Sequence, residues 1–452
     1  MSESSMNPIT EAQSKQPGRT YVLLILMLVY AFNHIDRQVL IILQEDIQRE
    51  FSLSDSQLGM LTGILFAILY STLGIPAAIW ADRGNRKKII TLALTIWAGM
   101  TALSGMALNF THIALARMGV AVGEAGCTPP ATSIIADLYP PKERATAMGI
   151  YTLGIGLGVL VGLALGDFVA DRYGWRIAFF VAGIPGLILA VLVWFSVREP
   201  QRGASEARRS DEPAPSILET FGFIFTQPSF LSLLVGCTLI CISANAFLAW
   251  VPVLMGRTYS FADGELGLAL GLLIGGFGCA GAILIGMVTD KLSARSLAWR
   301  PLIIAICGAV AIPFVFFALG AQSKWTFYVL YIVPSFVGLI YASIAYTAAQ
   351  ELVSVRMRAF AAAFTLLCLT LLGIGLGPWV TGAISDMFLA GMTPAGDEGA
   401  FTTAQQAEAL RQALYIILGL NVLSIPPLIL SARTYAHDVE RAAAGVSAST
   451  SG

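Results

Sequence analysis

Long apolar stretches recur along the whole chain, and short polar segments separate them. Each stretch has the roughly 20 residues that an α-helix needs to cross the hydrocarbon core of a bilayer. A polar stretch rich in charge, Pro and Ser, at 198–218, divides the stretches into two sets. The predicted spans are 20–43, 55–81, 88–110, 112–138, 145–170 and 177–197 in the first set, and 229–255, 264–289, 301–320, 325–350, 359–388 and 411–431 in the second.

This pattern predicts an all-α integral membrane protein with 12 transmembrane helices in two six-helix bundles. We expect the first bundle at 20–197 and the second at 219–431, joined by a cytoplasmic linker at 198–218. Short tails at 1–19 and 432–452 complete the predicted organisation.

Composition agrees with a membrane protein and excludes several other classes. Apolar residues make up 56% of the chain and charged residues 12%, against about 25% charged in soluble domains. The net charge is −1 and no basic tract is present, so we expect no nucleic-acid partner. All six cysteines lie in apolar segments without metal-ligand spacing, so we expect no disulfide, no metal and no cofactor.

Lys and Arg collect on one side of the predicted membrane. The loop after the second span and the linker are rich in them. The opposite side has only Arg49, Arg172, Arg176, Arg257, Lys324 and Arg411. The positive-inside rule therefore predicts that both termini are cytoplasmic. Short loops and tails favour a bacterial inner membrane.

The two sets of spans also repeat each other in sequence. The string LGIGLG occurs at 153–158 in the fifth span and at 372–377 in the eleventh. An Arg–Ala pair follows the fourth span at 144–145 and the tenth span at 358–359. Parallel repeats of six spans are a known plan of secondary transporters, with the substrate site at the repeat interface.

Several short motifs resemble those of known transporters. The loop motif GxxxDRxGRK has its counterpart at 78–88, where Ala78 and Asn85 replace two glycines, and GWRxAF stands at 174–179. Further motifs are Asp36–Arg37, Arg117, Gly123–Ala125, Arg198–Pro200, Gly377–Pro378 and Ser385–Asp386. The chain thereby resembles the major facilitator superfamily and, more narrowly, its spinster-like lipid transporters. The resemblance implies alternating access and transport of lysophospholipids or sphingoid phosphates by export or by proton-coupled carriage.

Ionisable residues inside the predicted spans are few, and such residues are functional by default. Counting about 1.5 Å per residue places Asp36, Arg37 and Arg117 at comparable depth in the outer half of the membrane. Glu124 lies nearer the middle. We predict that Asp36 and Glu124 couple transport to protons, and that Arg37 and Arg117 bind the substrate headgroup, because a guanidinium binds phosphate bidentately. The alternative is a static set of ion pairs that orients the first and fourth helices. His34 is open between a structural histidine and a proton relay.

Other residues are expected to line the pathway or to control it. The resemblance implies that Asp82, Arg83 and Arg86 latch the cytoplasmic side, with Asp290 and Arg295 as their second-half counterparts. Aromatic and polar residues within the spans are candidates for the substrate cavity, although packing is the more common role of any single aromatic residue. They are Tyr30, Phe66, Tyr70, Tyr151, Asn245, Trp250, Tyr341 and Tyr346.

Rival functions lack their sequence signatures. A membrane enzyme would need a nucleophile–base pair or metal ligands, and neither HExxH, GxSxG nor GxxxxGK[ST] occurs. The absence of a soluble signalling domain disfavours a sensor. We therefore predict a monomeric secondary transporter, not an enzyme, whose partners are protons, membrane lipids and a small amphiphilic lipid substrate. The alternative is a proton-coupled carrier of small organic anions or drugs.

Overall fold

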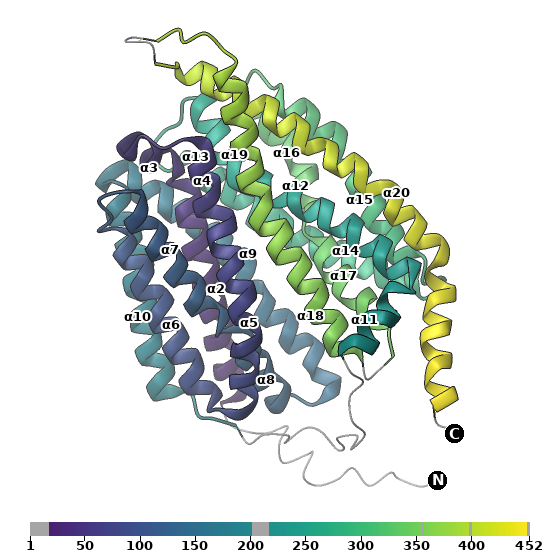
Figure 1. The fold of residues 1–452 in the computed structure, drawn as a ribbon. Helices are drawn as coiled ribbons and strands as arrows, with labels where there is room; N and C mark the ends of the chain where they lie inside the picture. Colours follow the sequence, from purple (N-terminus) through teal and green to yellow (C-terminus); the bar gives the residue numbers. More distant parts are fainter. Residues whose placement is uncertain (1–17, 201–216, 355–356, 397–399, 450–452) are drawn as a thin grey trace. The chain divides into compact units, whose positions relative to one another are not determined.

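Helices account for nearly all of the described chain. The computed structural model describes residues 18–200, 217–354, 357–396 and 400–449, and these residues contain no β-strand (Figure 1). The first helices are α2 (Arg19–Ile42), α3 (Gln44–Phe51), α4 (Asp55–Gly59), the π-helix η1 (Met60–Ile64), α5 (Leu65–Arg83), α6 (Arg86–Ser104), α7 (Phe110–Ala125), α8 (Thr128–Leu138), α9 (Pro141–Tyr173) and α10 (Trp175–Ser196). The later ones are α11 (Ile217–Phe225), α12 (Pro228–Thr258), α13 (Glu265–Leu270), the π-helix η2 (Gly271–Phe277), α14 (Gly278–Ser293), α15 (Trp299–Leu319), α16 (Lys324–Gly338), α17 (Ile340–Glu351), α18 (Arg358–Cys368), the π-helix η4 (Leu369–Ile374), α19 (Gly375–Ala390) and α20 (Thr403–Ser449).

Ten helical stretches in the described residues are long and apolar enough to cross a membrane. This confirms the all-α membrane fold, since a helix satisfies its own backbone hydrogen bonds in lipid. The spans predicted at 88–110 and 112–138 are helical as well, as α6 and as α7 with α8. These helices are shorter or more polar, because α6 begins with Arg86, Lys87 and Lys88, and α7 carries two buried charges.

Three helical segments differ from the sequence-based prediction. The last helix, α20, covers Thr403–Ser449, whereas the predicted span was 411–431. Its polar extensions are rich in Ala, Gln and Glu, which favour helix without making it apolar. The short helices α3 and α11 were not predicted either. Positions 201–216 of the expected linker, and parts of both expected tails, lie outside the described residues.

The helices assemble into two compact units, of which unit 1 consists of residues 1–43 and 68–211. Within it α2 runs along α9, and glycines allow the two backbones to approach closely. A Cβ atom at Gly154 would lie only 2.6 Å from the carbonyl oxygen of Met27, and one at Gly158 would overlap Ala31. The first LGIGLG string therefore serves helix packing.

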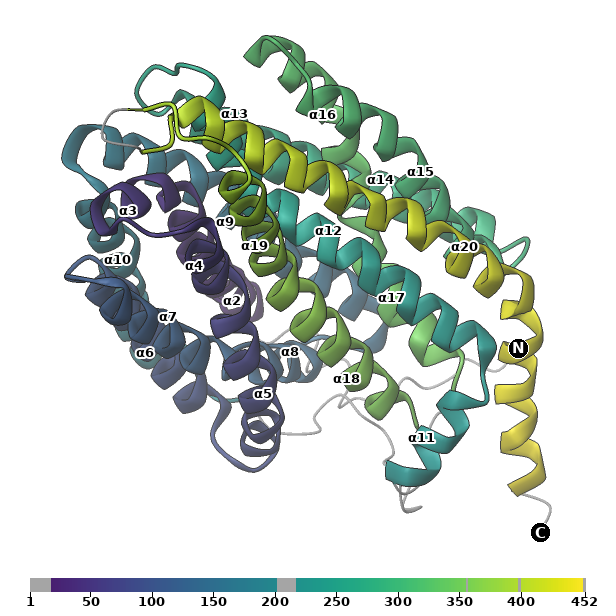
Figure 2. The same cartoon turned by 45° about the horizontal axis from the view of Figure 1, so that its top comes forward.

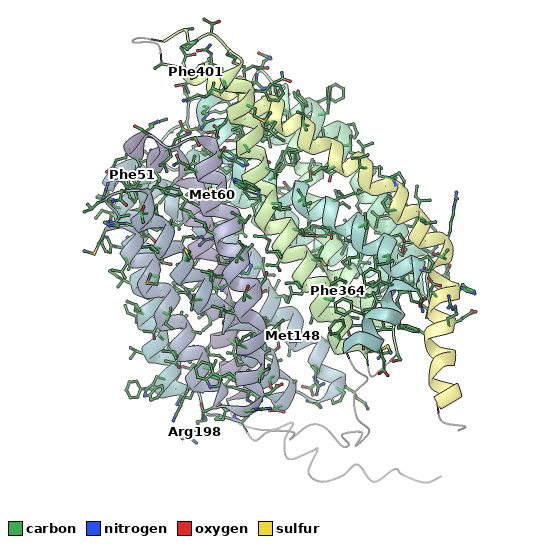
Figure 3. All side chains as sticks on the ribbon, in the orientation of Figure 1. Phe51, Met60, Met148, Arg198, Phe364 and Phe401 are labelled. Atoms are coloured by element: carbon green, nitrogen blue, oxygen red, sulfur yellow. The ribbon has the colours of Figure 1, made fainter. Side chains whose placement is uncertain are left out.

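Unit 2 consists of residues 44–67 and 212–452. In this unit α12 and α20 lie side by side in both Figure 1 and Figure 2. Aromatic packing joins α11 to α18, where the ring of Phe221 lies 5.2 Å from that of Phe364, labelled in Figure 3. Tyr435 on α20 donates a hydrogen bond to Glu351 at 3.0 Å.

An early segment of the chain, Gln44–Ala67, belongs to unit 2 and packs against its helices. Its helix α4 and the following η1, marked by Met60 in Figure 3, pack on α19. A Cβ atom at Gly59 or Gly382 would overlap the backbone of the other helix. Glycine at these positions therefore permits backbone-to-backbone contact.

Candidate functional site

An ion pair buried in unit 1 joins α2 to α7. Arg37 donates from Nε to Oε2 of Glu124 at 2.7 Å, and its Nη2 lies 2.5 Å from the same oxygen. The Glu124 side chain is fully buried, whereas the Arg37 side chain is 18% exposed. The second oxygen of Glu124, Oε1, accepts no hydrogen bond from the described residues. The buried carboxylate thus pairs with a guanidinium that is itself partly exposed.

Asp36, the neighbour of Arg37, has a different environment. Its side chain is buried, and neither carboxylate oxygen makes a hydrogen bond with the described part of the chain. Thr101 on α6 and the buried Arg117 on α7 are among its polar neighbours. A buried carboxylate costs much free energy when ionised without hydrogen bonds. The environment of Asp36 thus differs from that of Glu124, whose carboxylate pairs with Arg37.

Aromatic side chains of unit 1 surround this cluster. The Tyr70 ring lies 5.2 Å from the Arg37 guanidinium carbon, in cation–π geometry. The Tyr30 ring stacks on Tyr151 with centroids 4.5 Å apart and an interplanar angle of 8°. His34 meets Tyr30 edge-on, and its Nδ1 lies 3.1 Å from the Tyr30 carbonyl oxygen. The structure thus gathers these three predicted cavity tyrosines around α2.

The other predicted cavity residues belong to unit 2, where hydrogen bonds or core packing hold them. Tyr341 donates to Sγ of Cys241 at 3.2 Å, and Asn245 donates to the Cys241 carbonyl oxygen at 2.9 Å. Trp250 is fully buried and donates from Nε1 to the Pro378 carbonyl oxygen at 2.8 Å. Phe66 is buried, and Tyr346 is partly buried against the core of the unit. The hydrogen bond of Trp250 ties α12 to α19.

The predicted cytoplasmic latch residues have unequal environments. Asp82 and Arg83 are exposed, and so are Asp290 and Arg295. Arg86 is instead 1% exposed and pairs with Asp137 and, at 2.7 Å, with Glu199. Burial lowers the pKa of the Arg86 guanidinium, but its bonds to Glu199 and Asp137 outweigh this effect and raise the pKa overall.

A second buried ion-pair cluster, which we call the Arg257 cluster, lies in unit 2 and was missed from the sequence. The Arg257 side chain is fully buried at the end of α12. Its guanidinium bonds both oxygens of Asp55, at 2.7 and 3.1 Å, together with Oε2 of Glu45 at 3.0 Å. It also donates to Oε1 of Gln48 at 2.6 Å. The cluster therefore fastens the Gln44–Ala67 segment to α12.

Asp386 on α19 also binds the Gln44–Ala67 segment, through hydrogen bonds. Its carboxylate accepts hydrogen bonds from the backbone N–H of Asp55 at 3.0 Å and of Ser56 at 2.8 Å, and also from the Ser56 hydroxyl. Ser385 donates to Asp55 Oδ2 at 2.7 Å. Asp386 thus satisfies backbone donors at the start of α4, where a negative charge is favoured. The sequence signals were the Ser385–Asp386 pair and a lone arginine ending an apolar span.

Metal chemistry has no visible basis in the described residues. No group of three or more His, Cys, Asp or Glu side chains is placed there to hold a metal ion. The six cysteines are free thiols, and Cys127, Cys237 and Cys241 are buried.

Known proteins resemble this chain over most of its length. Residues 26–378 match the Major Facilitator Superfamily. An MFS-type efflux pump of Mycolicibacterium smegmatis is 32% identical over 367 residues, which cover 80% of this chain and 83% of the pump. Protein spinster homolog 1 of Xenopus laevis is 28% identical over 392 residues, or 82% of this chain and 73% of that protein. The crystal structure of a bacterial homologue of the human lysosomal transporter Spinster, inward-facing and unoccupied, is 32% identical with a TM-score of 0.84. It covers 94% of this chain and 99% of that one.

Proposed function

Because the chain belongs to the Major Facilitator Superfamily, and is therefore a multi-pass membrane transporter rather than an enzyme, we propose that it is a proton-coupled carrier of an amphiphilic lipid. The substrate would be a lysophospholipid or a sphingoid phosphate, moved by alternating access. The similarity to spinster proteins supports this substrate class.

One observation carries the proton-coupling part of the proposal. Asp36 and Glu124 are both buried in unit 1, and Glu124 has a close guanidinium partner, Arg37. Ionising Asp36 in that environment costs free energy that protonation removes. Arg37, partly exposed, is the member of the cluster that an anionic headgroup can approach.

The substrate headgroup and the Glu124 carboxylate would compete for the Arg37 guanidinium, because both are negatively charged. A phosphate that binds the Arg37 fork withdraws the guanidinium from Glu124. Glu124 would be left buried and unpaired, and it would take up a proton in place of its lost partner. Arg117, which is also buried near both carboxylates, would supply the second positive charge for the phosphate. Release of the substrate would restore the ion pair and expel the proton.

The remaining assignments belong to the same proposal. Asp82, Arg83 and Arg86 would form the cytoplasmic latch of the first bundle (20–197), and Asp290 and Arg295 that of the second (219–431). The carrier would work as a monomer in a bacterial inner membrane, with both termini in the cytoplasm.

Transport into proteoliposomes tests the proposal directly. Labelled lysophospholipid or sphingoid phosphate would be supplied with and without an imposed pH gradient. We expect gradient-dependent transport by the unmodified chain, and its loss in Asp36→Asn and Glu124→Gln. Glu440→Gln is the matched control, because Glu440 is an exposed carboxylate on α20.

The headgroup assignment needs its own comparison. Arg37→Ala should weaken transport of phosphate-bearing substrates more than of uncharged amphiphiles. Equal losses for both substrates would remove Arg37 from the headgroup site. Normal proton dependence in the Asp36 and Glu124 variants would remove the coupling role.

A second candidate function is export of small organic anions or drugs. The 32% identity to an MFS-type efflux pump supports it. The same proteoliposomes, loaded with soluble organic acids instead of lipids, distinguish the two. Gradient-dependent movement of acids, without lipid transport, would favour this second function.

A further inference from the structure

The helices α6 and α10 of unit 1 pack along each other, and the start of α6 meets the end of α10 (Figure 1). Lys87 places its Nζ atom 5.4 Å from the centre of the Trp194 ring, in cation–π geometry. The backbone N–H of Lys87 donates to Oε2 of Glu199 at 2.9 Å. Arg198, labelled in Figure 3, directly follows α10. These contacts gather the charged residues of both helix ends on one surface, which we call the α6–α10 surface.

Three basic residues of the α6–α10 surface are accessible to an external anion. Lys88 and Arg198 are exposed, and Lys87 is partly exposed. None of the three forms an ion pair within the described part of the chain. A phosphate group can therefore approach them without breaking an existing ion pair.

The other charged side chains at these helix ends do not cancel the three basic residues. Asp137 and Glu199 pair with Arg86, which leaves one negative charge in excess there. Asp82 and Arg83 are exposed and offset each other. The surface thus has five basic and three acidic side chains, a surplus of two positive charges.

An exposed apolar stripe on α10 leads away from these charges. It consists of Ile184, Ile188, Val191 and Phe195, whose exposed fractions range from 48% to 80%. Their spacing of four, three and four residues places them on one face of the helix. At 1.5 Å per residue the stripe is about 17 Å long, close to one leaflet of a hydrocarbon core of about 30 Å. Trp194 lies between the stripe and Lys87, and tryptophan is typical of the level of the lipid headgroups.

We propose that the α6–α10 surface binds an anionic phospholipid, with its phosphate on Lys87, Lys88 and Arg198 and one acyl chain along the α10 stripe. Clusters of basic residues at the ends of membrane helices attract anionic headgroups. The surplus of positive charge favours an anionic lipid over a zwitterionic one, whose headgroup has no net charge. The length of the stripe fits an acyl chain of the adjoining leaflet. This site goes beyond the transport function and does not depend on it.

Native mass spectrometry of the full chain, purified free of lipid, tests the site. The probes are phosphatidylglycerol and phosphatidylcholine with the same acyl chains, each titrated against the protein. We expect phosphatidylglycerol to bind at least about tenfold more tightly, since each basic residue near an anionic lipid contributes a factor of about five. The double variant Lys87→Gln, Lys88→Gln should lose most of this preference and should bind phosphatidylcholine as before. Equal binding of the two lipids by the unmodified chain would overturn the proposal.

The matched control is the double variant Lys142→Gln, Lys291→Gln. These lysines are also exposed, but they lie on α9 and α14, so the same two charges are lost at other places. We expect the control to retain the preference for phosphatidylglycerol. An equal loss in the two double variants would show a general attraction to the charge of the whole protein and would overturn the site.

A photolabel locates the acyl chain. Phosphatidylglycerol with a diazirine at the end of one chain should label α10 peptides that contain Ile184 and Ile188, and the Lys87→Gln, Lys88→Gln variant should reduce this label at least about fivefold. Label spread evenly over the helices would overturn the assignment of the stripe. A lipid-free dimer in the native spectra, with the α10 stripe protected from the label, would show that a second copy of the chain covers it and would also overturn the proposal.

Discussion

The Arg257 cluster makes a quantitative prediction about the Gln44–Ala67 segment. Replacing Arg257 by Ala would leave the carboxylate of Asp55, 5% exposed, without its bidentate partner, and would remove the buried guanidinium from Glu45 as well. Removing one member of a buried ion pair costs about 3–5 kcal/mol. That cost falls on the state in which α4 and η1 are packed against α12 and α19. Since about 1.4 kcal/mol is a factor of ten in an equilibrium constant, the segment should open roughly 100- to 4000-fold more often.

Amide hydrogen exchange measures this opening directly, because local opening sets the exchange of protected amides. The amides of Asp55 and Ser56 are suited to the measurement, since they donate to Asp386 in the packed state. We expect Arg257→Ala to lower the protection of residues 55–64 by about two to three and a half orders of magnitude, in line with a loss of about 3–5 kcal/mol. Protection within the helices of unit 1 should stay as it is.

Arg49→Ala is the matched control, because Arg49 also pairs with Glu45, at 3.4 Å, but its side chain is 65% exposed. An exposed pair contributes only about 0–1 kcal/mol, so exchange should hardly change. Arg257→Lys keeps the charge but loses the bidentate geometry, and should fall between the two. Unchanged protection of residues 55–64 in a folded Arg257→Ala protein would refute the reasoning.

Two further predictions concern packing and the cytoplasmic side. Gly382→Ala should lower the protection of the same segment against hydrogen exchange, because its Cβ atom would overlap the Asp55 backbone. Gly74→Ala is the control, because the space around Gly74 is open. Equal protection in the two variants would contradict the packing account. Arg86→Gln should lower the thermal unfolding temperature in detergent, since it removes the ion pairs that the 1% exposed guanidinium makes with Asp137 and Glu199. These partners are 10% and 25% exposed, so the loss should stay below the about 3–5 kcal/mol of a fully buried pair. Lys88→Gln, at an exposed position of the same helix, is the control, and a similar small shift in both would argue against a structural role of Arg86.

The sequence was sufficient to predict the membrane-spanning helices and the membrane environment. Apolar runs of about 20 residues are explained by helices that cross a bilayer. Charged residues within these runs are rare, and this singled out Asp36, Arg37, Arg117 and Glu124. Counting along the helices placed Asp36, Arg37 and Arg117 at comparable depth. It placed Glu124 nearer the middle of the membrane, and the structure pairs this residue with Arg37. The sequence could not indicate which polar residues neighbour Asp36, because that depends on the rotation of α2 relative to α6 and α7.

The Arg257 cluster could not have been predicted from the sequence by the same reasoning. Arg257 stands at the end of an apolar span, where the positive-inside rule treats it as an ordinary outer-side charge. Its partners Glu45 and Asp55 precede it by some two hundred positions. The difference in exposure between Asp82 and Arg86 likewise depends on contacts with residues far away in the sequence. Both stand in one loop motif, and only the positions of Asp137 and Glu199 separate their roles.

The membership of Gln44–Ala67 in unit 2 has a consequence for cutting the chain in two. A break in the stretch between α10 and α11 divides the covalent chain, but it does not divide the packed units, because the segment would stay with the first fragment. The second fragment alone would expose the Asp386 carboxylate and the glycine surface of α19 on which α4 rests. Neither fragment would then contain all of its own contacts. Split versions of this transporter should therefore assemble only when both pieces are made together.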